Sequence, residues 1–198
     1  MKKLLLGSTL FFGLVNIQAH ADYVPQQTQS VSQMAAQYAH MDVNSLQKAA
    51  KSGQPAAQFY LATHYQAGTG GVAKDLKQSF AWFKAAADQG ISAAQLNVGR
   101  MYADGLGVSK SETSARQYFE KAASHGDNRA SFNLAVMEEQ KKNYMGAYQW
   151  YELSTRDGML DNKVINMSQS KKTALAANLT QDQIRTATQR ADQWIQAQ

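Results

Sequence analysis

Apolar positions recur at helical spacing in paired segments along this chain. In one segment Ala57, Leu61 and Tyr65 are four residues apart, which places them on one face of a helix. Gly68 is expected to close this helix, and a second helix is expected after Asp75, whose carboxylate can accept the free N–H groups of a first turn. The buried face of the second helix is expected to carry Ser79, Trp82, Phe83 and Ala86.

This pair of helices is repeated. We expect full copies at about residues 56–91, 92–127 and 128–159, preceded by a half copy at residues 46–53. Each full copy has an N-cap residue seven positions before a large aromatic and a glycine eight positions after it, at Asp75, Trp82 and Gly90, at Ser111, Tyr118 and Gly126, and at Asn143, Trp150 and Gly158. A repeat of this length predicts an all-α fold, an α-solenoid of stacked helix-turn-helix units.

The second copy carries a recognisable repeat pattern. Its matching positions are Ala94, Val98-Gly99, Tyr102, Gly105-Leu106-Gly107-Val108, Ala115, Tyr118-Phe119, Ala122-Ala123 and Gly126. In these residues the chain resembles the Sel-one-like repeat family, relatives of the tetratricopeptide repeat, and the resemblance implies scaffolding between proteins. The third copy departs from the pattern, because Glu138 replaces the Tyr and Lys141-Lys142 replace the Gly-rich loop. We therefore expect a direct turn between its two helices.

The N-terminal segment has the features of an export signal. Lys2 and Lys3 precede an apolar run over residues 4–17, and Ala19-His20-Ala21 forms a small-x-small site. The run is shorter than the 20 or so apolar residues that a membrane span needs. We expect cleavage after Ala21, no stable membrane insertion afterwards, and a periplasmic or secreted product. Residues 22–32 are rich in Gln and Ser and are expected to form a flexible leader.

The remaining residues, 33–198, are expected to form one repeat domain that ends in capping helices over residues 161–198. Thr180 and Gln183 have the spacing of a capping box at the start of the last helix. Its apolar stripe is expected to contain Ile184, Ala187, Ala191 and Ile195, with Trp194 beside it.

Composition gives little sign of catalytic chemistry. The chain has no cysteine, which removes disulfides, thiolate nucleophiles and Cys-based metal sites. Its net charge of +5 falls to +3 without Lys2 and Lys3, which is too small an excess to indicate a nucleic-acid partner. The histidines lack metal-ligand spacing, and the Gly-x-Gly segments are not followed by the Lys of a phosphate loop. We therefore expect no enzyme activity, no cofactor and no bound metal.

A partner-binding surface is the remaining candidate. By resemblance to the tetratricopeptide pattern, the concave face should present residues from the first helix of each copy, and we expect Phe59, Gln66, Leu96, Arg100, Asp104, Arg129, Phe132 and Glu139 there. The apolar row Phe59, Leu96 and Phe132, flanked by the two arginines, would suit an extended or helical peptide with apolar anchors and some negative charge. Alternatively, the same row packs only between adjacent helices. The sequence leaves both interpretations open.

These observations favour a periplasmic, non-enzymatic adaptor or modulator that binds another protein or peptide. Two alternatives remain from the sequence: an immunity-type inhibitor of a toxic effector, and an accessory or enzymatic factor that acts on cell-wall polymer.

Overall fold

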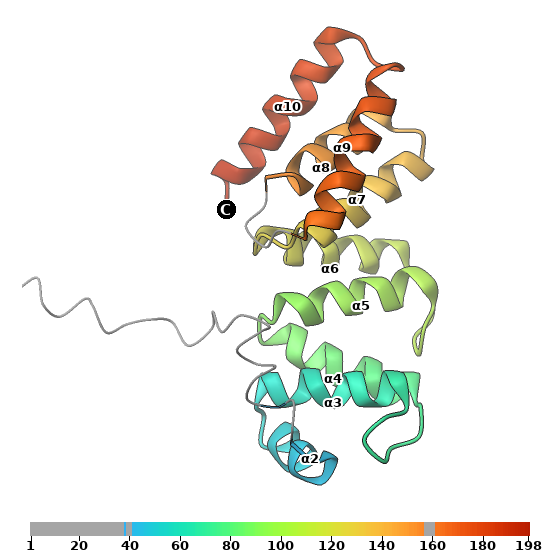
Figure 1. Cartoon of the computed structure of the whole chain (residues 1–198), viewed down its shortest axis with the longest axis vertical. Coiled ribbons are helices and arrows are strands. Elements are labelled where there is room, and N and C mark those ends of the chain that lie inside the picture. Colours follow the sequence, from blue (N-terminus) through green and yellow to red (C-terminus); the bar gives the residue numbers. More distant parts are fainter. Residues whose placement is uncertain (1–37, 39–40, 157–160) are drawn as a thin grey trace, which may run out of the picture.

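The computed structural model of this protein describes Tyr38, residues 41–156 and residues 161–198. This part of the chain consists of helices without strands, as the all-α prediction required. The helices stack in chain order into an elongated array, from α2 at one end to the C-terminal helices at the other (Figure 1). The predicted export signal and leader lie outside the described residues.

The repeats form three helix pairs. The elements are α2 (Val43–Lys51), α3 (Pro55–Ala67), α4 (Leu76–Asp88), α5 (Ser92–Asp104), α6 (Glu112–Ser124), α7 (Asn128–Gln140), α8 (Tyr144–Ser154), α9 (Asn162–Ala176) and α10 (Gln181–Gln196). Within each repeat the two helices pack extensively on each other, as α3 on α4, α5 on α6 and α7 on α8. The array is therefore the predicted solenoid of helix pairs.

Local sequence signals set the ends of these helices. Asp75 accepts hydrogen bonds from two backbone N–H groups at the start of α4, and Ser111 and Asn143 each accept one at the starts of α6 and α8. All three predicted N-caps are confirmed. Gly68 and Gly105 end α3 and α5 in the left-handed conformation, with φ of 72° and 73°. In the third repeat only residues 141–143 separate α7 from α8, so the expected direct turn is also confirmed.

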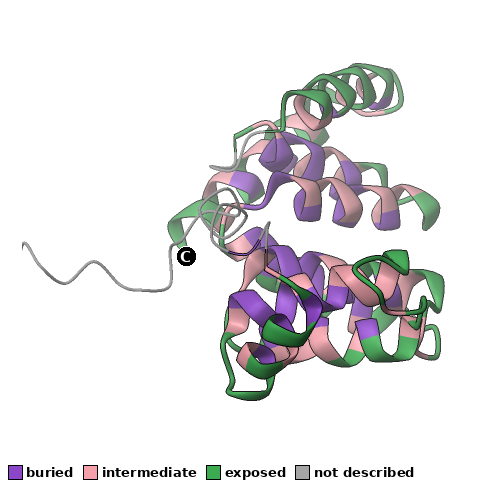
Figure 2. Ribbon diagram, turned by 60° about the horizontal axis from the view of Figure 1, so that its bottom comes forward, coloured by how far each residue is buried: buried purple, intermediate pink, exposed green. Residues whose placement is uncertain are grey.

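Small residues let the helices approach closely. Alanines fill much of the core, and Gly99 of α5 lies so near the Phe119 ring that a Cβ at this position would be 2.6 Å from it. Figure 2 shows the buried residues gathered on the inner sides of the stacked helices. The core therefore runs along the whole array as a set of connected clusters, which is the arrangement expected of a solenoid.

The equivalent aromatics of the three repeats are not equally buried. Trp150 is 6% exposed and Tyr118 is 9% exposed, as expected for core residues. Trp82 was also expected in the core, but it is only partly buried at the boundary between two clusters. The difference has a physical cause, because the Trp194 ring of α10 packs edge-on against Trp150, with ring centroids 4.9 Å apart. In the described part of the chain, no comparable ring pair involves Trp82.

The C-terminal helices cover the third repeat. α10 packs on α8 through Ala187 and Ala191, and the predicted capping box between Thr180 and Gln183 is present. The predicted stripe is wrong at its last position, because Ile195 is 46% exposed. Trp194 turns toward α8 instead, which leaves its neighbour facing solvent. Among the described residues, no helix is long and apolar enough to span a membrane.

Candidate partner-binding groove

A pocket of about 350 Å³ opens on the side of the solenoid formed by the first helices of the repeats. It is lined by residues of α3, α5, α7 and α9, namely Phe59, Ala93, Leu96, Asn97, Arg100, Arg129, Phe132, Asn133 and Val164. We call this set the repeat groove. Five of the eight residues predicted for a partner-binding surface therefore lie together in the structure, and they come from all three repeats.

The floor of the groove is the apolar row. Phe59, Leu96 and Phe132 are 37 and 36 residues apart, so each occupies the same position in its repeat. Phe59 packs edge-on against Phe83 at 5.5 Å, and Phe132 packs in the same way against Tyr151 at 5.4 Å. Phe59 is 8% exposed and Leu96 is 4% exposed. The row thus belongs mainly to the core between helices, while its remaining exposed edges line the groove.

Two asparagines give the groove hydrogen-bonding groups. Asn97 and Asn133 occupy equivalent positions in the second and third repeats. Each uses one side-chain N–H to bond the backbone carbonyl one turn earlier, at 2.8 Å to Ala93 and 2.7 Å to Arg129. These bonds fix the amide groups on the helix surface. Each side-chain oxygen is a hydrogen-bond acceptor of the kind that a ligand backbone N–H can use.

The two arginines of the groove are not equivalent. Arg129 donates to both carboxylate oxygens of Asp127, at 2.9 Å and 2.7 Å, and this hydrogen-bonded pairing raises the pKa of Arg129 above its ordinary value. Asp127 is fully buried and also caps α7. Arg100 is exposed and has no ion-pair partner among the described residues. The free positive charge of the groove therefore comes from Arg100.

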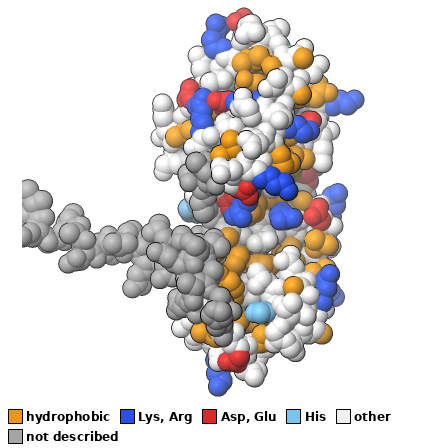
Figure 3. All heavy atoms as spheres, in the orientation of Figure 1, with side chains coloured by type: hydrophobic (Ala, Val, Ile, Leu, Met, Phe, Trp, Pro, Cys, Tyr) orange, Lys and Arg blue, Asp and Glu red, His pale blue; other side chains and the backbone are white. Residues whose placement is uncertain are grey.

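The groove lining is basic, although the wider surface is mixed. In Figure 3 several Lys and Arg side chains lie at mid-height on the viewed face, with Asp and Glu side chains among them. The groove lining itself contains two arginines and no acidic residue. Since Asp127 neutralises one of these arginines, the groove favours a single negative group next to apolar surface.

The other three predicted residues lie away from the groove. Gln66 and Asp104 are at the C-terminal ends of α3 and α5, and Glu139 is near the end of α7. They follow the apolar row by seven or eight positions, or about 10 Å along a helix. The groove crosses the earlier turns of these helices, so these three residues lie outside its lining, and their part in binding stays a prediction.

Glu139 is engaged within the protein. Its carboxylate accepts a hydrogen bond from the Tyr151 hydroxyl at 2.8 Å and pairs with Lys171 of α9 at 3.0 Å. Burial alone would raise the pKa of Glu139, but the Tyr151 and Lys171 contacts outweigh it and hold the pKa below its ordinary value. Burial also raises the pKa of Tyr151, with the neighbouring Glu139 adding to the effect. Glu139 therefore anchors α9 in this structure.

The sequence-based prediction missed four groove residues, namely Ala93, Asn97, Asn133 and Val164. Asn97 and Asn133 could have been found, because they recur in register one position after the apolar row. Val164 could not, because it belongs to α9, which lies outside the repeats. In the part of the chain that the structure describes, no group of three His, Asp or Glu side chains is arranged to hold a metal ion.

Comparison with known proteins identifies the class of repeat. The family model described as the Sel1 repeat matches residues 55–91, 92–127 and 129–159, which are the three helix pairs and together more than half of the chain. This protein belongs to the Sel1 repeat family, as the sequence pattern predicted. Proteins of this family generally mediate protein–protein interaction.

Solved Sel1-type structures resemble the fold. A protective antigen of uropathogenic Escherichia coli, described as displaying an SLR fold, superposes with a TM-score of 0.54 at 25% identity, covering 78% of this chain and 40% of the other. A Sel1 repeat protein from Oxalobacter formigenes gives a TM-score of 0.53 at 32% identity, covering 63% of this chain and 95% of the other. Both support the solenoid architecture.

Two curated proteins share part of the sequence. A chitin synthase regulator of Malassezia restricta is 31% identical over 45% of this chain. A component of an ERAD-associated E3 ubiquitin-protein ligase of Arabidopsis thaliana is 32% identical over 48% of this chain. The matched segments are 6% and 15% of those proteins, so the similarity is confined to a small part of each.

Proposed function

We propose that this protein is a non-enzymatic scaffold or modulator that binds a partner protein through the repeat groove. The observation that carries the proposal is the meeting of residues from three repeats around one pocket, with an apolar floor, two amide groups and an arginine that has no ion-pair partner among the described residues. Pockets of this kind combine apolar walls with a few oriented polar groups. The curated relatives, a regulator and a ligase component, are consistent with such a role.

The partner segment is a short, extended peptide stretch with a large apolar side chain next to an acidic group. A pocket of about 350 Å³ is at the small end of ligand sites, which favours a few extended residues over an α-helix about 10–12 Å wide. The apolar side chain would contact the edges of Phe59, Leu96 and Phe132. The carboxylate would pair with Arg100, and Asn97 and Asn133 would hydrogen-bond the peptide backbone.

We also propose that binding takes place in the periplasm or outside the cell. The support is the sequence of residues 1–21, which has a basic start, a short apolar run and a small-x-small site. Intact-mass measurement of the expressed protein tests this. We expect an N-terminus at Asp22 and a product in the soluble fraction. A mass that retains residues 1–21, with the protein in the membrane fraction, would contradict export.

Site-specific photo-crosslinking tests the groove directly. Benzoylphenylalanine placed at Asn97 should give crosslinked products with a partner in intact cells. The same group at Arg190, an exposed position on α10 outside the groove lining, serves as the control and should not give those products. Introducing Arg100→Glu should abolish the products formed from position 97. Products of the same mass from both positions, or persistence with Arg100→Glu, would place binding elsewhere.

A further inference from the structure

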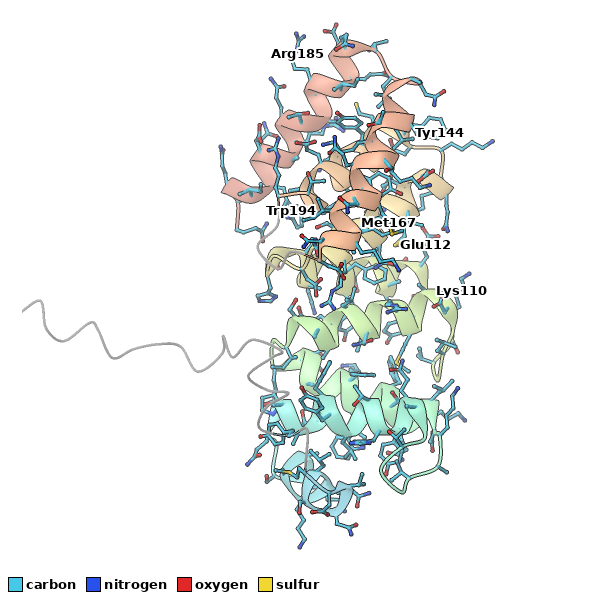
Figure 4. All side chains as sticks on the ribbon, viewed as in Figure 1. Lys110, Glu112, Tyr144, Met167, Arg185 and Trp194 are labelled. Atoms are coloured by element: carbon cyan, nitrogen blue, oxygen red, sulfur yellow. The ribbon has the colours of Figure 1, made fainter. Side chains whose placement is uncertain are left out.

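Helix α9 buries fewer of its residues than the repeat helices do. Only Ser168 and Leu175 of its fifteen residues are buried, as only Ala187 and Ala191 of α10 are, whereas α5 and α7 of the repeats bury six or more each. Met167, which is labelled in the middle of α9 in Figure 4, is 43% exposed. Helices with few buried apolar contacts are the ones that open locally while the rest of a protein stays folded.

The contacts that hold α9 are mostly polar. The hydroxyls of Ser168 and Ser154 form a buried hydrogen bond at 2.6 Å, and Lys171 pairs with Glu139 at 3.0 Å. Lys172 pairs with Glu152 of α8. Each of these contacts joins α9 to α7 or α8. If α9 moves away, water can solvate the polar groups that it leaves, or another polar segment can bind them.

Helix α9 also limits the groove. Val164 in its first turn forms one wall of the groove beside Phe132, and Lys171, two turns later, binds Glu139 of α7. Figure 1 shows α9 running across the repeat helices instead of parallel to them. Helix α9 therefore lies over the part of α7 that would continue the groove from Phe132 toward Glu139.

We infer that α9 is a displaceable wall of the repeat groove: it undocks from α7 and α8 as a unit while the repeats stay folded, and so exposes a longer binding surface. When α9 is docked, as in this structure, α9 itself covers that surface. The surface that it leaves carries Glu139 and Glu152, so a longer partner segment would place a basic residue where Lys171 now lies. This consequence for binding rests on the proposed function, whereas the undocking does not.

The absence of cysteine makes the undocking measurable. Ser168→Cys places a single thiol under α9, and Ser79→Cys places one in α4, and both serines are fully buried. Reaction with a thiol reagent requires each site to open. We expect Cys at position 168 to react at least tenfold faster than Cys at position 79 in native buffer, and its rate to be nearly independent of low urea concentrations because only local opening is needed.

Charge variants connect this opening to the Lys171–Glu139 pair. Lys171→Glu should speed labelling at position 168 about tenfold and leave labelling at position 79 unchanged. Lys163→Glu is the matched control, because Lys163 is exposed on α9 without an ion-pair partner among the described residues, and it should change neither rate. Combining Lys171→Glu with Glu139→Lys should restore the slow rate.

A disulfide supplies an independent check. Cysteines at positions 154 and 168 replace two hydroxyls that are already 2.6 Å apart, so they should oxidise readily and lock α9 in place. Equal labelling rates at positions 168 and 79, or a 154–168 pair that does not form, would overturn the inference. No ligand enters these measurements, so their failure would leave the proposed binding at the groove untouched. Failure of the binding experiments would likewise leave the undocking of α9 untouched.

Discussion

Single residues fix how closely neighbouring repeats approach in this protein. Gly107 lies in the loop between α5 and α6 with φ of +73°, and a Cβ there would be 2.0 Å from the backbone oxygen of Leu76 in the preceding repeat. Gly71, in the corresponding loop of the first repeat, also has a positive φ of +87° but has open space around it. A Cβ at Gly71 would therefore introduce backbone strain alone, whereas a Cβ at Gly107 would introduce the same strain and a steric clash with the preceding repeat.

The first prediction compares Gly107→Ala with Gly71→Ala. Gly71→Ala should lower the free energy of unfolding by about 1–2 kcal/mol, because an L-residue is forced into the left-handed region. Gly107→Ala adds the clash with the Leu76 backbone and should cost at least about 1 kcal/mol more. Urea unfolding followed by circular dichroism measures both. Equal losses would mean that the loop of the second repeat does not contact α4 as described.

A second prediction concerns the tryptophans. Trp150→Ala removes a core side chain that also packs against Trp194, so it should cost about 3–5 kcal/mol. Trp82→Ala should cost clearly less, about half as much, because Trp82 is only partly buried. Denaturant unfolding of both variants checks the order. A larger loss with Trp82→Ala would contradict the burial found for the two rings.

At the scale of elements, an ionic cluster connects the last three helices. Glu152 of α8 pairs with Lys172 of α9 and with Arg156, and Arg156 reaches Asp192 of α10. Burial alone would raise the pKa of Glu152, but these cations outweigh it and hold the pKa below its ordinary value. The carboxylate is therefore more easily ionised in the folded protein than in the unfolded chain.

A depressed folded-state pKa gives a definite pH dependence. The stabilisation from Glu152 is fully present above the unfolded pKa and is lost as the pH falls through the folded value. We expect the free energy of unfolding to fall between about pH 5 and about pH 3, and Glu152→Gln to flatten that fall. Glu112→Gln is the control. Glu112 pairs with Lys141 in solvent and should contribute little. Equal slopes for wild type and Glu152→Gln would contradict this role.

The success of sequence reasoning depended on how local each signal was. The caps at Asp75, Ser111 and Asn143 and the direct turn of the third repeat follow from neighbouring residues, and all were predictable. The apolar row followed from the repeat period. The position of α9 was not predictable, because it depends on Ser154–Ser168 and Glu139–Lys171 contacts between segments that the period does not relate. The exposed fraction of Trp82 was not predictable either, because Trp150 is covered by the Trp194 ring from outside the repeats, and no comparable ring pair in the described part of the chain involves Trp82.

At the scale of the whole molecule, the solenoid brings residues of three repeats together around one groove. No single repeat contains the groove, because Phe59, Arg100, Asn133 and Val164 come from four different helices. The charge of the groove is set by one residue. Arg129 is paired with Asp127, so among the groove-lining residues Arg100 carries the charge that has no ion-pair partner in the described part of the chain. We propose that this groove selects a peptide with an apolar residue beside a carboxylate.

Selection from a random peptide library displayed on phage tests that claim directly, because it does not require the natural partner to be identified. With the chain lacking residues 1–21 as bait, the enriched peptides should carry a large apolar residue next to Asp or Glu. Their affinity should fall at least about tenfold with Arg100→Glu, which is about 1.4 kcal/mol, because a charge-assisted contact becomes a repulsion. Arg190→Glu, on exposed α10 outside the groove, should leave it unchanged. Enrichment of basic or neutral peptides, or equal binding to both variants, would contradict the account.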